Sequence, residues 1–129
     1  MTAPVVDAVD PFDLPEALGA EQVTWTAGVS VDGRPLVRGA FAPADGEQVG
    51  CDLLAGDLAY PVAVLGDSWR HDAHQAWTLG QVLLVRYEGR LTLVVPGTTV
   101  TLDLLVEALR RFAKAVGADP ERYVVAVRL

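Results

Sequence analysis

The chain has 129 residues, of which 51% are hydrophobic and 21% charged, and its formal net charge is −7. A chain of this length fits one domain whose core needs neither a disulfide nor a metal ion. Its ten basic residues are scattered among seventeen acidic ones, so it lacks the basic surface expected of a nucleic-acid or anionic-membrane binder. Nine of the ten bases are arginine, which is typical of a GC-rich bacterial genome.

The cysteine count, the hydropathy and the charge of the N-terminus together indicate the cellular compartment. Cys51 is the only cysteine, so the chain can form no internal disulfide and no cysteine-based zinc cluster. No apolar run approaches the roughly 18 residues that a membrane-spanning helix requires. The N-terminus is acidic, whereas a signal peptide begins with positive charge. We therefore expect a cytoplasmic protein without a cofactor, with neither nucleic acid nor a membrane as its partner.

The N-terminal residues 1–20 differ from the rest of the chain. They combine prolines with acidic side chains and contain no base, a composition typical of an extended arm that is mobile or draped on the surface. The remaining residues, 21–129, are predicted to form a single α+β domain.

Three strands are predicted at the start of this domain. Apolar and polar side chains alternate over residues 22–31, which indicates a half-buried strand. The pair Asp32-Gly33 predicts a hairpin turn, and one extra residue in that turn would set Trp25 opposite Phe41. A third antiparallel strand follows, and its inward row is expected to consist of Val49, Cys51, Leu53 and Ala55.

The middle of the chain begins with residues 56–66, which are apolar and leave open either a short edge strand or a crossing segment. A helix over residues 67–80 follows, with Asp67 as a suitable N-cap. Its buried face is predicted to contain Trp69, Ala73, Ala76, Trp77 and Gly80.

The C-terminal part is predicted to contain a hairpin, a helix and a strand. Residues 82–87 and 91–95 flank a tight turn at Glu88-Gly89, and both segments are apolar on both faces. The next helix, residues 102–116, is capped by Thr101 and ends before Gly117. Its core-facing stripe is predicted to be Leu102, Leu105, Val106, Leu109, Phe112, Ala113 and Val116.

The only two histidines lie on the first helix. Asp67, His71 and His74 share one face at spacing compatible with a metal site. That face lies opposite the apolar stripe, and a cation at a helix N-terminus opposes the helix dipole. We therefore predict a solvent-exposed face and no metal site, keeping these three residues as the candidate ligands.

Other catalytic constellations are not supported by the sequence. Cys51 falls in an inward row, where a thiol behaves as a small inert hydrophobe. The carboxylate pairs Asp52 with Asp57 and Asp67 with Asp72 are interpreted as solubilising charge, because no apolar pocket is indicated that would separate their pKa values. No nucleotide-binding glycine motif or serine-hydrolase elbow occurs. We predict no catalytic and no cofactor-binding residues.

A second apolar strip on the last helix suggests a partner surface. Leu104, Ala108 and Ala115 lie opposite the predicted core stripe, beside Arg111. If both helices cover the same face of the sheet, the other face remains apolar and exposed, which favours a homodimer. These four residues are the candidate partner-binding residues.

The predicted fold is α+β, an antiparallel sheet of five or six strands in the order βββαββαβ with two main helices. The order of elements over residues 15–117 resembles the type III secretion chaperone-like fold, a dimeric partner-binding module, and the strand after Gly117 departs from it. We expect a non-catalytic dimeric protein-interaction module, chaperone-like or regulatory. The alternatives are a small-ligand binding domain and a small enzyme using an apolar pocket. A closed apolar cavity would favour the ligand binder, and titratable groups gathered in a cleft would favour the enzyme.

Overall fold

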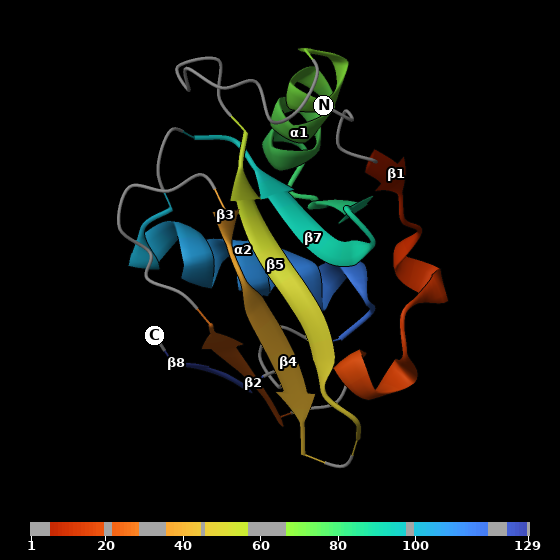
Figure 1. Cartoon of the computed structure of the whole chain (residues 1–129), viewed down its shortest axis with the longest axis vertical. Helices are drawn as coiled ribbons and strands as arrows, with labels where there is room; N and C mark the ends of the chain where they lie inside the picture. Colours follow the sequence, from red (N-terminus) through yellow and green to blue (C-terminus); the bar gives the residue numbers. More distant parts are fainter. Residues whose placement is uncertain are drawn as a thin grey trace.

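The computed structural model describes residues 6–19, 22–28, 36–44, 46–56, 67–97, 100–118 and 124–128. Eight strands, two α-helices and two short 3-10 turns make up this part of the chain (Figure 1). In chain order they are β1 (Val6–Ala8), η1 (Pro11–Asp13), η2 (Glu16–Gly19), β2 (Gln22–Ala27), β3 (Leu36–Val37), β4 (Gly39–Pro43), β5 (Val49–Ala55), α1 (Asp67–Thr78), β6 (Leu83–Tyr87), β7 (Arg90–Val95), α2 (Leu102–Ala115) and β8 (Val124–Arg128).

The strands form one mixed sheet in the order β1-β6-β7-β5-β4-β2-β8, and β3 pairs with β5 beside this path. The pairs β5·β7 and β2·β8 are parallel, and the other pairs are antiparallel. The α+β composition is therefore confirmed, whereas the antiparallel sheet of five or six strands is wrong. Strands β1 and β3 add to the predicted number, β8 is parallel to β2, and the parallel pair β5·β7 arises because the β6–β7 hairpin places β7 beside β5. Had β6 taken that position, its pairing with β5 would be antiparallel.

The two helices pack against different faces of the sheet. The side chains of Leu53 and Leu93 belong to the main core, together with α2. Their neighbours Leu54 and Val94 point the other way and form a second cluster with Ala73 of α1. The expectation that both helices cover one face is wrong, and the argument for a dimer that rested on it no longer applies. Two apolar faces in β6 and β7 are instead covered within one chain.

Part of the predicted N-terminal arm belongs to the sheet and the core. β1 pairs with β6, so Val6 lies opposite Tyr87. The backbone N–H of Val9 extends this contact by donating to the carbonyl oxygen of Leu84 at 3.0 Å. Further along, Leu18 is fully buried in the main core. Residues 6–19 are therefore fixed at several points, to the edge of the sheet at β6 and to the main core at Leu18.

The predicted register of the first hairpin and the predicted tight turn of the second are confirmed. Trp25 pairs with Phe41, as one extra residue in the turn requires, although the turn at residues 29–35 lies outside the described residues. In the second hairpin Tyr87 pairs with Arg90. Its two turn residues have positive φ angles, 52° at Glu88 and 80° at Gly89, the conformation of a tight two-residue turn. The segment 57–66, whose structure the sequence left open, also lies outside the described residues.

Helix α2 begins at the predicted residue with the predicted Thr101 cap and ends at Ala115, one residue before the predicted end, but its orientation differs. The side-chain oxygen of Thr101 accepts from the N–H of Leu104 at 3.2 Å, and Gly117 has the positive φ of a helix terminator. Leu102 and Val106, predicted to face the core, are exposed, and Ala108 is fully buried. The helix is turned toward its alanine-bearing side, where small side chains permit close packing.

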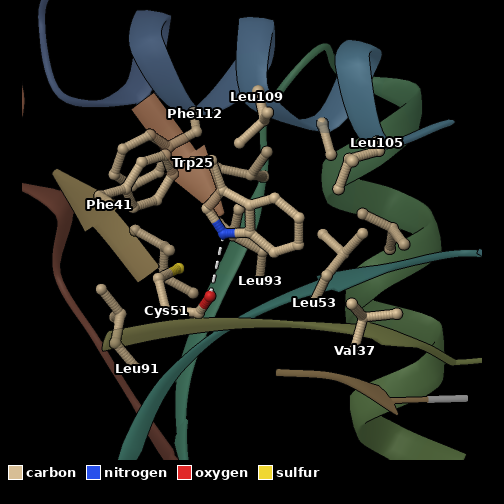
Figure 2. Packing of buried hydrophobic residues seen from close by; sticks show 14 of the residues in the cluster. Trp25, Val37, Phe41, Cys51, Leu53, Leu91, Leu93, Leu105, Leu109 and Phe112 are labelled. Carbon is tan, nitrogen blue, oxygen red and sulfur yellow. Dashed lines mark hydrogen bonds between the residues drawn. The ribbon is translucent and has the colours of Figure 1, made fainter. Parts of the chain in front are cut away.

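The centre of the main core is an indole set into the sheet. Figure 2 shows Trp25 between α2 and β5, with its Nε1 donating to the carbonyl oxygen of Cys51 at 3.0 Å. The ring lies against the backbone of Gly39, where a Cβ would come within 2.1 Å of it. Beside it the rings of Phe41 and Phe112 stack with centroids 4.8 Å apart, which joins β4 to α2.

Candidate functional site

The histidine-bearing face of α1 is exposed to solvent, as predicted. His71 and His74 are both exposed, and Asp67 is the first residue of the helix, while its side chain lies outside the described part. Among the residues that the structure describes, no group of three His, Cys, Asp or Glu side chains is placed to hold a metal ion.

Cys51 lies in the inward row of β5, where the alternation of side chains placed it. Its side chain is fully buried in the main core. Burial raises the pKa of this thiol, because the charged thiolate would lose its hydration, and the negative charge of the neighbouring Asp52 raises the pKa further. The thiol therefore remains neutral at physiological pH and contributes packing to the core.

Asp52 is the buried charge that the sequence interpretation assigned to solvent. Its residue is 1% exposed, and its carboxylate accepts two hydrogen bonds from Arg90, from Nε to Oδ2 and from Nη2 to Oδ1, each 2.9 Å long. The backbone N–H of Gly39 donates to the same Oδ1 at 3.1 Å. The carboxylate on β5 thus accepts from donors on two other strands, β7 and β4.

This ion pair lies beside the interruption between the end of β3 and the start of β4. The pairs on either side, Val37 with Leu53 and Ala40 with Gly50, share one register. Between them the N–H of Gly39 donates to a side chain, and the Cys51 carbonyl accepts from the indole of Trp25. Side-chain groups therefore satisfy backbone atoms at the interruption in the ladder. The pair has a structural role, and its position identifies no ligand.

The four candidate partner-binding residues do not form one exposed strip. Ala108 is fully buried, and Leu104 and Ala115 are half-buried against the main core. Arg111 is also half-buried, because it contacts the end of α1. The exposed surface that they share is smaller than the sequence suggested.

Arg111 joins the two helices. Its Cζ lies 3.6 Å from the ring centroid of Trp77, a cation–π contact, and its Nη1 donates to the carbonyl oxygen of the same residue. Its Nε donates to Oε1 of Glu107 at 3.2 Å, one turn earlier on α2. A cation beside the last carbonyl groups of α1 is also favoured by the helix dipole.

A surface hollow of about 220 Å³ lies beside this contact. One wall is the chain that leaves α1, and the other is the last part of α2. The hollow contains an exposed apolar side chain, Leu79, which is 67% exposed, and two cations, Arg111 and Lys114. The complete lining is Leu79, Gly80, Gln81, Arg111, Lys114 and Ala115. Two of the predicted partner-binding residues, Arg111 and Ala115, therefore meet residues that the sequence did not single out.

The lining residues that the sequence did not single out show no pattern that would have marked them as a site. Leu79 follows the last turn of α1 and reads as an ordinary helix-end residue. Lys114 reads as a cation that stabilises the C-terminus of α2. Only the packing of the end of α1 against α2 brings them together, and Arg111 takes part in that packing through its contacts with Trp77.

Comparison with known proteins gave no relative. No protein family, curated protein or solved structure matches the chain. None of the helices in the described residues is long and apolar enough to cross a membrane.

Proposed function

We propose that the chain is a protein-interaction module that binds a short segment of a partner in the hollow between α1 and α2. The observation that carries the proposal is the combination of a two-thirds exposed leucine with two cations around one concavity. An apolar side chain in contact with Leu79 would be removed from water. The cations favour a segment with acidic residues beside that apolar side chain.

Charge distribution along the chain supports this choice of ligand. The protein carries a formal charge of −7, yet three of its ten bases, Arg110, Arg111 and Lys114, fall within residues 110–114. Glu107 neutralises part of this charge through its bond to Arg111. Lys114 is exposed on the rim of the hollow. We place the module in a reducing compartment such as the cytoplasm, because its single cysteine is a buried free thiol.

The test is a titration of labelled eight-residue peptides, followed by fluorescence anisotropy. Each peptide has one phenylalanine or leucine between aspartates, and the control peptides have lysines in place of the aspartates. We expect the acidic peptides to bind and the basic ones not to bind. Leu79→Asp or Lys114→Glu should weaken binding tenfold or more, since each removes one of the two features of the hollow.

The matched control is Leu102→Asp. Leu102 is an exposed leucine on α2, the helix that carries Lys114. It lies twelve residues before Lys114 and so about 18 Å away along the helix axis. This variant should bind the acidic peptides like the wild type. If no peptide of the panel binds at several hundred micromolar, or if Leu79→Asp leaves the affinity unchanged, the proposed site is wrong.

A further inference from the structure

One exposed side chain on the N-terminal segment has the chemistry that the hollow would accept. Phe12 lies in the turn η1 and is 92% exposed. Asp10 and Asp13 flank it and are also exposed. No basic residue occurs among the first 33 residues of the chain, so the charged residues next to Phe12 in the sequence are all acidic.

The turn that carries Phe12 is held in place at both ends. Before it, the N–H of Val9 donates to the carbonyl oxygen of Leu84, and after it Leu14 packs against the main core. Within the turn Oδ1 of Asp10 accepts from the N–H of Phe12 at 3.0 Å. A large apolar side chain is thus held in solvent by an anchored turn and not by a frayed end.

We propose that Phe12 of one copy binds in the hollow between α1 and α2 of a second copy of this chain. This inference rests on the proposed function of the hollow and names its partner. The two surfaces are complementary in charge, since aspartates flank the aromatic ring and Arg111 and Lys114 line the hollow. The same chain cannot make the contact in the observed state, because its own Phe12 is almost fully exposed while the turn is anchored.

Both surfaces lie at the same end of strand β6, which favours a closed dimer. Phe12 is three residues from Val9, and Gln81 of the hollow is three residues from Leu84. A residue spans at most about 3.6 Å, so each lies within about 11 Å of the Val9–Leu84 contact, measured along the chain. When both surfaces belong to one patch, a two-fold axis allows each copy to place its Phe12 in the hollow of the other copy. The interface would then close and would not continue into a filament.

Sedimentation equilibrium of the full chain over micromolar to millimolar concentrations tests this proposal. We expect a concentration-dependent dimer, and Phe12→Ala should raise its dissociation constant tenfold or more, because an aromatic anchor is lost. Phe12 touches little in the monomer, so circular dichroism and melting of this variant should match the wild type. Leu102→Ala, which removes another exposed apolar side chain, should leave dimerisation unchanged.

Charge reversal identifies the pairing. Asp13→Lys and Lys114→Asp should each weaken the dimer several-fold, and the double variant should recover at least part of the loss because the opposite charges are again paired. A chain that stays monomeric throughout, or a dimer that Phe12→Ala or Leu79→Asp leaves intact, would overturn the inference. If the peptides of the panel bind to the Phe12→Ala protein while the wild type is monomeric, the proposed function stands and only its partner is wrong. If neither peptides nor a second copy bind, both proposals fail.

Discussion

Replacing Arg90 by methionine removes the charged partner of a carboxylate that has almost no access to water. The side chain of Asp52 is 2% exposed and that of Arg90 is 40% exposed. Breaking a fully buried pair costs about 3–5 kcal/mol, and an exposed pair contributes about 0–1 kcal/mol. Because one partner is buried and the other is partly solvated, we expect Arg90→Met to lower the free energy of unfolding by about 2–3 kcal/mol.

A second substitution, at Asp52, tests whether the unpaired buried charge causes this loss of stability. Asp52→Asn removes the charge but keeps an oxygen that can accept from the N–H of Gly39. Alone it should cost about 1 kcal/mol, since the amide NH₂ would face Nε of Arg90. In the double variant no charge is left buried without a partner. Asp52→Asn/Arg90→Met should therefore be more stable than Arg90→Met alone, although it carries one more substitution.

Urea denaturation followed by tryptophan fluorescence measures these differences, provided that the slope of the transition is the same in all variants. The reasoning is refuted if Arg90→Met costs less than about 0.5 kcal/mol, the range of ordinary surface substitutions. It is also refuted if the costs of the two single substitutions simply add, because the buried charge would then not be the source of the loss.

Two further predictions concern the core around Trp25. Gly39→Ala should lower stability by about 3 kcal/mol or more in the same denaturation assay, because its Cβ would lie 2.1 Å from Cζ2 of the indole. Gly50→Ala is the milder control, because the atom nearest to its Cβ would be Nη2 of Arg90, at 3.2 Å. Cys51 should react slowly with a thiol reagent in the native protein and fast in urea, since burial raises the pKa of the thiol. Rapid labelling of the native protein would contradict the placement of Cys51 in the core. Because the thiol of the unfolded chain has the lower pKa, the unfolded state loses this proton first, so the free energy of unfolding should fall as pH rises above about 8.5.

Local patterns in the sequence predicted the elements that local interactions determine. The paired positions of Trp25 and Phe41 followed from matching two alternating faces across a turn. The limits of α2 followed from Thr101 and Gly117, whose roles depend only on the adjacent turn of helix. In each case the residues that determine the structure are close in sequence.

Strand order could not be predicted in the same way. Alternation shows which face a side chain occupies, but not which strand lies beside it. Leu53 was placed correctly in the core, whereas its neighbouring strand β7 and the parallel pairing were missed. Asp52 was interpreted as solubilising charge because the sequence indicated no pocket around it, yet Arg90 on a strand distant in sequence makes burial of its charge possible. The orientation of α2 was missed because alanine fits both a core and a surface position, and Ala108 was assigned to the wrong one.

Arg111 illustrates why the hollow should be tested through its neighbours. Its guanidinium lies over the ring of Trp77 and donates to the carbonyl at the end of α1, so it holds one wall of the hollow against the other. Replacing it would change the shape of the hollow and remove a cation at once, and loss of binding would not separate these effects. Leu79 and Lys114 are exposed, and substitutions there should leave the helix contact intact. A binding loss in these variants at unchanged stability therefore reports on the ligand contact alone.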